Sequence, residues 1–129
     1  MTNPRVVCLV GPTGVGKSAV ALQLAERFDG EIINADSRQV FRAFPLITAQ
    51  PSAEEQARCP HRLYGFLDTD ARFSAGAWGE RALGHIQRAA FPLLVGGTGL
   101  YLRALFDGIV DIPPIPEALI ARLTETCER

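Results

Sequence analysis

The sequence of 129 residues lacks several features that would assign it to a specialised class of protein. Its net charge is −1, so no excess of positive charge points to nucleic acid or to an anionic membrane. Its three cysteines are scattered and form no Cys-x-x-Cys pair, which argues against a disulfide framework or a zinc site. No apolar run approaches the roughly 18 residues of a membrane span, and no signal-peptide core follows Met1. We therefore expect a cytoplasmic protein with no membrane partner.

Lysine is nearly missing as well, because only Lys17 among the thirteen basic residues is a lysine. It belongs to a Gly-x-x-x-x-Gly-Lys-Ser motif that lies between an apolar run and a stretch with helical spacing, as a phosphate-binding loop requires. In such a loop, backbone N–H groups surround the phosphate, the lysine adds a compact charge, and the hydroxyl of Ser18 can bind Mg²⁺. A glycine-rich turn without a ligand is the less favoured alternative. The motif consists of Gly11, Pro12, Thr13, Gly14, Val15, Gly16, Lys17 and Ser18.

The rest of the chain alternates between strand-like apolar runs and helical spacing. This pattern predicts an α/β fold, a P-loop NTPase-like parallel sheet with helices on both faces. One short helix is expected to begin after Ser52, where Glu55 completes a capping-box pattern. The predicted strands cover residues 6–10, 31–34, 61–67 and 91–95, and the predicted helices cover residues 18–28, 52–58, 74–90, 100–106 and 117–127.

The chain is expected to divide near residue 110. Residues 1–110 carry all the motifs and form the expected P-loop α/β catalytic core, whereas residues 111–129 hold a proline-rich crossover and a last helix. We expect this crossover and helix to lead toward a helical region that is missing, so that the fold is truncated. The alternative is a terminal helix that packs back on the sheet.

Three of the predicted strands end in polar or glycine-rich residues. These ends are the phosphate loop, Asp36–Ser37 and Gly96–Thr98, and ligands bind parallel α/β sheets at the carboxyl ends of the strands. Asp36 is a candidate general base, hydrogen-bond acceptor for a second substrate, or metal ligand through water, with a turn or N-cap aspartate as the alternative. Thr98 is a candidate contact for a transferring group, with a simple helix N-cap as the alternative.

Other residues point away from particular functions. The apolar strand before Gly96 does not end in the acid that a motor-type NTPase uses for Mg²⁺ and water, so that class is disfavoured. The histidine at position 61 is expected to have a structural role. Four arginines could bind phosphate or RNA, but we expect them simply to be solvated in an arginine-rich loop. They are Arg38, Arg42, Arg58 and Arg62.

Taken together, these motifs resemble the N-terminal part of the tRNA dimethylallyltransferases, also called tRNA isopentenyl-pyrophosphate transferases. The phosphate loop resembles the GPTxxGK[ST] segment of that family. Its DSxQVYR, TAKP, PHHL and GGTGLYL segments have counterparts at residues 36–42, 48–51, 60–63 and 96–102. The resemblance runs from about residue 6 to 110. Phe41, Ile47 and Gln50 depart from the family pattern, and members of the family are considerably longer.

The resemblance implies the transfer of a dimethylallyl group to tRNA. The loop would hold dimethylallyl diphosphate, with Mg²⁺ near Ser18. Asp36 would take a proton from the exocyclic amine of an adenosine next to the anticodon as that nitrogen attacks the allylic carbon. Thr98 would contact the leaving-group oxygen. The residues implied to touch the tRNA are Asp36, Ser37, Arg38, Gln39 and Thr98.

Three other functions fit a phosphate loop in this setting. A small-molecule kinase would use Asp36 to hold an acceptor hydroxyl, but it needs an arginine-rich lid that the sequence does not show clearly. A related prenyltransferase would use free AMP as the acceptor. A fragment without turnover would simply bind a nucleotide or a diphosphate.

Overall fold

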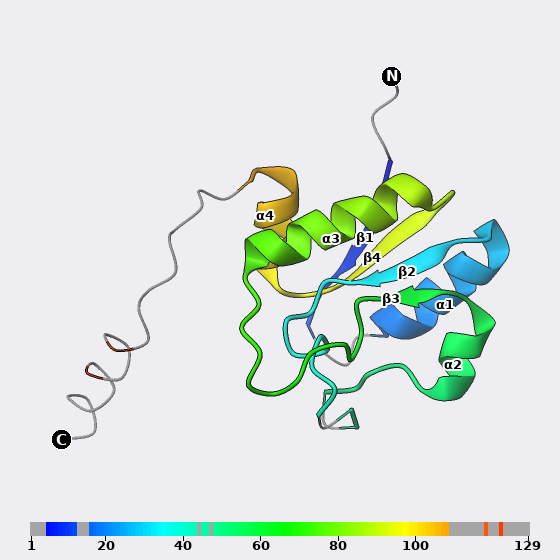
Figure 1. Cartoon of the computed structure of the whole chain (residues 1–129). Coiled ribbons are helices and arrows are strands. Elements are labelled where there is room, and N and C mark those ends of the chain that lie inside the picture. Colours follow the sequence, from blue (N-terminus) through cyan, green and yellow to red (C-terminus); the bar gives the residue numbers. More distant parts are fainter. Residues whose placement is uncertain are drawn as a thin grey trace.

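The structure, a computed structural model, describes residues 5–12, 16–43, 45–46, 48–108, 118 and 122 (Figure 1). Within these ranges, four strands form one parallel sheet in the order β1-β4-β2-β3. The strands are β1 (Val7–Val10), β2 (Glu31–Asn34), β3 (His61–Arg62) and β4 (Pro92–Gly96). Because β4 lies between β1 and β2, the carboxyl ends of these three strands meet at one edge of the sheet.

Helices cover both faces of the sheet. They are α1 (Lys17–Phe28), α2 (Ala53–Arg58), α3 (Ala75–Arg88) and α4 (Gly99–Phe106). α1 lies on one face, and α3 lies on the opposite face with α4 packed beside it (Figure 1). The α/β class and the parallel sheet between helices are therefore confirmed.

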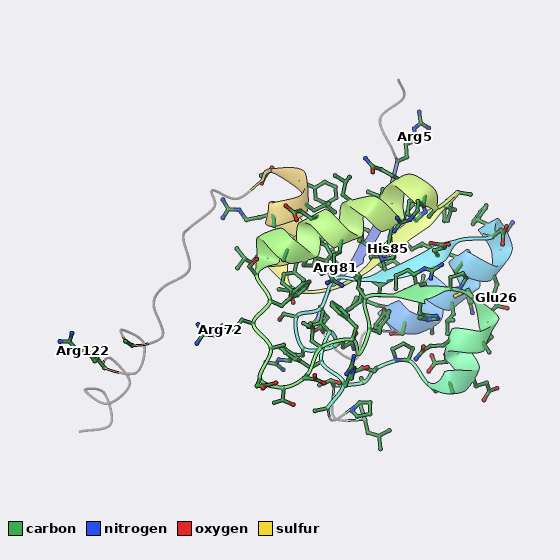
Figure 2. All side chains as sticks on the ribbon, viewed as in Figure 1. Arg5, Glu26, Arg72, Arg81, His85 and Arg122 are labelled. Atoms are coloured by element: carbon green, nitrogen blue, oxygen red, sulfur yellow. The ribbon has the colours of Figure 1, made fainter. Side chains whose placement is uncertain are left out.

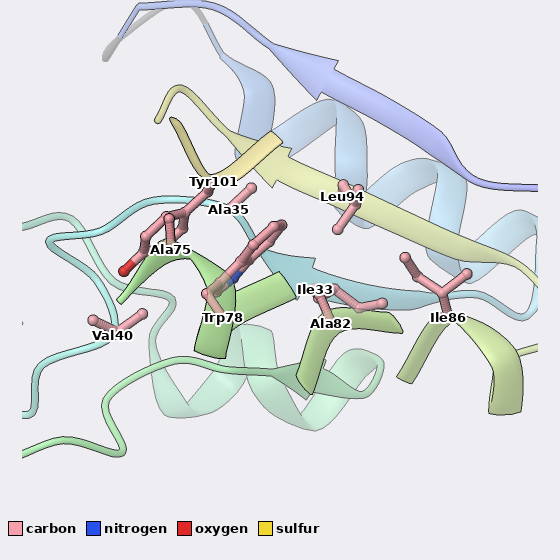
Figure 3. Close-up of a cluster of buried hydrophobic side chains, with 9 residues drawn as sticks. All are labelled: Ile33, Ala35, Val40, Ala75, Trp78, Ala82, Ile86, Leu94 and Tyr101. Atoms are coloured by element: carbon pink, nitrogen blue, oxygen red, sulfur yellow. The ribbon is translucent and has the colours of Figure 1, made fainter. Parts of the chain in front are cut away.

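The two faces of β2 and β4 bury separate apolar clusters because neighbouring strand residues point to opposite sides. Ile32 and Leu93 pack with Leu22 of α1. On the other face, Ile33 and Leu94 pack with residues of α3 and α4 (Figure 3). The members of this second cluster are Ile33, Ala35, Val40, Ala75, Trp78, Ala82, Ile86, Leu94 and Tyr101.

Serine caps begin two of the helices. Ser52 and Glu55 form the predicted capping box of α2, each side chain bonding the main chain of the other. The hydroxyl of Ser74 accepts a hydrogen bond from Ala77 N–H at the start of α3. α3 forms despite its glycines because its buried face, which includes Trp78, packs on the sheet.

Two expectations about strands were wrong. The strand expected at residues 61–67 is only His61–Arg62, because Leu63 and Gly65 adopt positive φ angles of 66° and 53° that end it. β1 was expected to be buried, yet three of its four residues are exposed, Cys8 among them. The reason is its place at the edge, where β4 is its single partner among the described residues.

The predicted crossover at residues 112–116 and the helix after it lie outside the described residues, apart from positions 118 and 122. Among the residues that are described, no helix combines the length and apolar character needed to cross a bilayer.

Candidate active site

The three strand ends named above form what we call the strand-end rim: residues 11–12, 16–18, 35–39 and 96–98. The first part links β1 to α1. Gly16 takes φ of 91° at the N-cap of α1, a conformation that favours glycine. Lys17, the first residue of α1, donates from its ammonium to the Gly11 carbonyl and, at 2.9 Å, to the Pro12 carbonyl. The predicted loop residues Thr13, Gly14 and Val15 lie outside the described residues.

Thr98 joins the second and third strand ends. Its hydroxyl oxygen accepts a hydrogen bond from Ser37 N–H at 2.9 Å, and its own N–H donates to the Ala35 carbonyl at 3.2 Å. Thr98 occupies the N-cap position of α4, as the alternative interpretation held, but its side chain makes no capping hydrogen bond there. The hydroxyl instead fixes the Asp36–Ser37 segment.

Gly96 and Gly97 allow this close approach. A Cβ on Gly96 would lie 2.4 Å from the Ala35 carbonyl carbon and 2.8 Å from Asp36 N. A Cβ on Gly97 would lie 3.0 Å from the Gly11 carbonyl oxygen. The glycine turn therefore rests directly on both of the other strand ends, and any side chain at Gly96 would push them apart.

The Asp36 carboxylate has both a local role and an open side. Its Oδ1 accepts a hydrogen bond from Arg38 N–H at 2.8 Å, the geometry of a turn aspartate. Oδ2 has no hydrogen-bond partner among the described residues, and the residue is half-buried at the wall of a cavity. The turn interpretation is thus correct for one oxygen and leaves the other available to a ligand.

Contiguous cavities follow the rim. One of about 430 Å³ is lined by Lys17, Asp36, Thr98 and other residues from all three strand ends. A larger one, of about 850 Å³, extends from Lys17 and Asp36 past Ser18 toward α2. Because the two cavities share Lys17 and Asp36, a ligand with its phosphates on the loop can reach the Asp36 carboxylate.

A third cavity, of about 800 Å³, begins at Arg38 and Thr98 and has a mostly apolar wall that includes Phe73 and Tyr101. The ring of Tyr101 stacks on Trp78, with 4.8 Å between ring centroids. Burial, with a smaller contribution from the Asp36 carboxylate, raises the pKa of the Tyr101 hydroxyl, so it stays a neutral donor.

The side chain of Gln39, implied to touch tRNA, makes hydrogen bonds to a neighbouring loop. Its Nε2 donates to the carbonyls of Thr48 and Ala49 at 2.7 and 3.1 Å. Gln50, which stands where the family has lysine, donates to the Phe41 carbonyl at 2.6 Å. Both amides therefore order the segment beside the larger cavity, and the lysine's charge is absent there.

The four arginines do not form one cluster. Arg42 pairs with Asp68 at 2.9 Å, and Arg62 pairs with Glu31 at 3.4 Å. Arg58 of α2 pairs with Glu26, which projects from α1 on the side of α2 (Figure 2). Arg58 also lines the larger cavity, whereas Arg38 lines the other two, and the Arg38 guanidinium has no ion pair within the described part of the chain. His61 has the structural role expected, with Nδ1 at 2.9 Å from the Cys59 carbonyl.

Sequence reasoning missed Asn34. It is fully buried at the end of β2, and its amide makes three hydrogen bonds to the main chain of Asp36 and Leu63. The available signal was one amide that follows two isoleucines at the end of the strand, directly before the residues assigned to the site.

Comparisons with known proteins give one consistent result. A model of the family described as IPP transferase matches residues 39–129. A tRNA dimethylallyltransferase of Nitratidesulfovibrio vulgaris strain DP4 is 65% identical over 128 residues, which is 96% of this chain and 41% of the relative. A tRNA dimethylallyltransferase of Lawsonia intracellularis is 54% identical and covers 99% of this chain and 43% of its own length. This chain therefore spans about two fifths of the length of these relatives.

Solved structures agree with the sequence comparisons. The full-length tRNA isopentenylpyrophosphate transferase of Bacillus halodurans matches with a TM-score of 0.79 and 34% identity, over 98% of this chain and 43% of that one. A eukaryotic dimethylallyltransferase acting on tRNA matches with a TM-score of 0.76 and 32% identity, over 89% of this chain and 31% of that one.

Proposed function

Because this chain belongs to the IPP transferase family, we propose that it carries the catalytic core of a tRNA dimethylallyltransferase. In this reaction a dimethylallyl group passes from dimethylallyl diphosphate to the exocyclic amine of an adenosine next to the anticodon of tRNA. The observation that carries the proposal is that Lys17, Asp36 and Thr98, from three separate strand ends, line one cavity. A tRNA substrate would place the reaction in the cytoplasm.

The phosphate loop would bind the diphosphate. The Lys17 ammonium would exchange its carbonyl partners for phosphate oxygens, close to the N-terminus of α1. Ser18 is exposed beside Lys17 on the wall of the larger cavity, which suits a hydroxyl ligand of Mg²⁺. No group of three acidic, His or Cys side chains within the described residues could hold a metal alone, so the substrate phosphates would complete the coordination. When bound, Mg²⁺ would neutralise charge on the departing diphosphate.

The proposed step forms one bond and breaks one. The exocyclic nitrogen attacks the allylic carbon, the carbon–oxygen bond to the diphosphate breaks, and the nitrogen loses a proton. Asp36 Oδ2 would accept that proton, because Oδ1 is held by Arg38 N–H. The Thr98 hydroxyl would contact the leaving-group oxygen. Arg38, beside both of the cavities that Thr98 lines, would meet the tRNA with Ser37.

The test is Asp36→Asn in a family-length hybrid, in which residues 1–129 are joined to the C-terminal region of the 65% identical relative. Asparagine keeps the size of the side chain and can still bond Arg38 N–H, but it cannot accept the proton. We expect the single-turnover rate of transfer to tRNA to fall by about 10²- to 10⁴-fold, with pyrophosphate affinity unchanged.

A matched control is Asp68→Asn, which alters an exposed aspartate paired with Arg42 and should leave the rate within about twofold, as surface ion pairs contribute little. An Asp36→Asn hybrid that works within a few-fold of the parent would show that Asp36 is only a turn residue.

A further inference from the structure

We propose that Asn34 is a positioning residue that holds the main chain of Asp36 so that its carboxylate faces the cavity. This inference rests on the proposed function, in which Asp36 is the proton acceptor. Asn34 itself does not line the cavities that Asp36 lines. Its effect on the reaction would therefore pass through the backbone.

The amide of Asn34 grips Asp36 on both sides. Its Oδ1 accepts a hydrogen bond from Asp36 N–H at 2.9 Å, and its Nδ2 donates to the Asp36 carbonyl at 3.0 Å. With both main-chain groups fixed by one rigid amide, Asp36 cannot rotate about its backbone without breaking two hydrogen bonds to a fully buried side chain. The direction of the Cα–Cβ bond, and hence of the carboxylate, is set in this way.

The same amide ties Asp36 to a second loop. The Nδ2 group also donates to the Leu63 carbonyl at 3.0 Å, and Leu63 has a φ of 66°, which L side chains rarely adopt. One side chain thus fixes both the Asp36 segment and Leu63, which lies 29 residues after Asn34 in the sequence. On its other side, the Asp36 peptide lies against the backbone of Gly96, with no room between them for a side chain. The Asp36 peptide is therefore constrained on two sides.

Only an amide supplies this set of bonds at this length. A carboxylate at position 34 would present oxygen to the Asp36 and Leu63 carbonyls, which need a donor. A leucine of similar size would leave the Asp36 N–H and the Leu63 carbonyl without the partner that Asn34 provides, and the Asp36 carbonyl would keep only the Gln39 N–H, at 3.2 Å. A glutamine has the same groups but is one methylene longer in a space with no exposure.

The test compares two variants that loosen the same strand end. Asn34→Ala removes all three amide hydrogen bonds. Trp78→Phe is the matched control, because the Trp78 indole N–H donates to the main-chain carbonyl of Asn34 at 2.7 Å and does not touch its amide. Urea unfolding gives the stability of each variant. NMR hydrogen exchange then reports on the Asp36 amide in this chain, and kcat and KM are measured in the hybrid.

We expect Asn34→Ala to speed exchange of the Asp36 amide and to lower kcat by about tenfold or more, since small misplacements of a reacting group are costly. The KM for dimethylallyl diphosphate should stay within about twofold, because the Lys17 contacts do not involve Asn34. Trp78→Phe should lower stability while kcat and the exchange at Asp36 stay near the parent values. If Asn34→Ala does not fold, Asn34→Ser, which keeps a hydroxyl, replaces it.

The outcomes separate the two claims. If both variants lower kcat and speed exchange in proportion to their loss of stability, Asn34 is a structural residue and the inference is wrong. If the parent hybrid shows no transfer, the proposed function fails, and the ratio of exchange rates at Asp36 in the two variants still decides whether Asn34 positions it.

Discussion

The interior of the sheet and the strand-end rim are stabilised in different ways. In the interior, fully buried carbon surfaces such as those of Ile33, Trp78 and Leu94 pack against one another. At the rim, the three strand ends are joined by individual hydrogen bonds, as at Thr98, and by glycines in direct backbone contact, as at Gly96. An apolar core accepts changes of shape at constant volume, whereas a backbone contact accepts no added atom. Stability and site geometry therefore depend on different residues.

The largest expected effect is on the interior. Trp78→Ala removes a buried indole from the α3 face and should lower the free energy of unfolding by about 3–5 kcal/mol. Urea unfolding followed by circular dichroism measures the loss. Leu83→Ala, at an exposed position of the same helix, is the control and should change little. A small loss for Trp78→Ala would mean that the interior does not carry the stability.

Lys17→Ala should have the second-largest effect, on ligand binding and not on folding. The ammonium contacts only loop carbonyls, so its removal costs little packing. A hydrogen bond to a charged group is worth about 1.5–3 kcal/mol, which predicts about a 10- to 150-fold loss of affinity for pyrophosphate with Mg²⁺. Calorimetric titration measures it, with Arg27→Ala in α1 as a charge-matched control. Unchanged affinity would refute the phosphate loop.

Gly96→Ala tests the backbone contact directly. The added Cβ, 2.4 Å from the Ala35 carbonyl carbon, forces β4 away from the Asp36 segment and should cost about 1–3 kcal/mol of stability. In the hybrid, transfer should fall further than this loss of stability explains, because Asp36 and Thr98 move apart. Gly99→Ala has open space around its Cβ and serves as the control. If Gly96→Ala and Gly99→Ala had the same stability and the same transfer rate, the backbone contact at Gly96 would not control the geometry of the rim.

The smallest effect concerns the pH dependence of stability, through a half-buried histidine of α3 that lies away from the rim. Burial, followed by the nearby Arg88 guanidinium, lowers the pKa of His85 in α3 (Figure 2). The unfolded chain, with an ordinary histidine pKa of about 6.5, then binds a proton more readily than the folded chain. The contribution of His85 to stability is therefore complete above about pH 6.5 and is lost as the pH falls through the lowered value.

His85→Gln should make the melting temperature fall less between pH 7.5 and pH 5 than it does in the parent chain. The rim residues do not contact His85, so pyrophosphate binding at pH 7.5 should be the same in both. An identical acid response in the variant would show that His85 does not titrate on unfolding.

Local patterns predicted much of this molecule. β2 has the predicted bounds, and the capping box at Ser52 was correct, because both depend on residues close in sequence. The exposure of β1 could not be predicted, since it depends on which strands lie beside it. The positive φ of Leu63 and the partners of Asn34 also depend on distant contacts. The catalytic roles of Asp36 and Thr98 stay predictions.

The ammonium of Lys17 is occupied before any ligand arrives. In the proposed phosphate loop, an incoming anion would have to replace the Gly11 and Pro12 carbonyls, so its net affinity would be the difference between two sets of contacts. A monovalent ion such as chloride, offering one weak contact, gains almost nothing from this exchange. A diphosphate, with several charged oxygens and a shared cation, gains much more. If the loop binds phosphate as proposed, these resting contacts of Lys17 would make it select anions of higher charge.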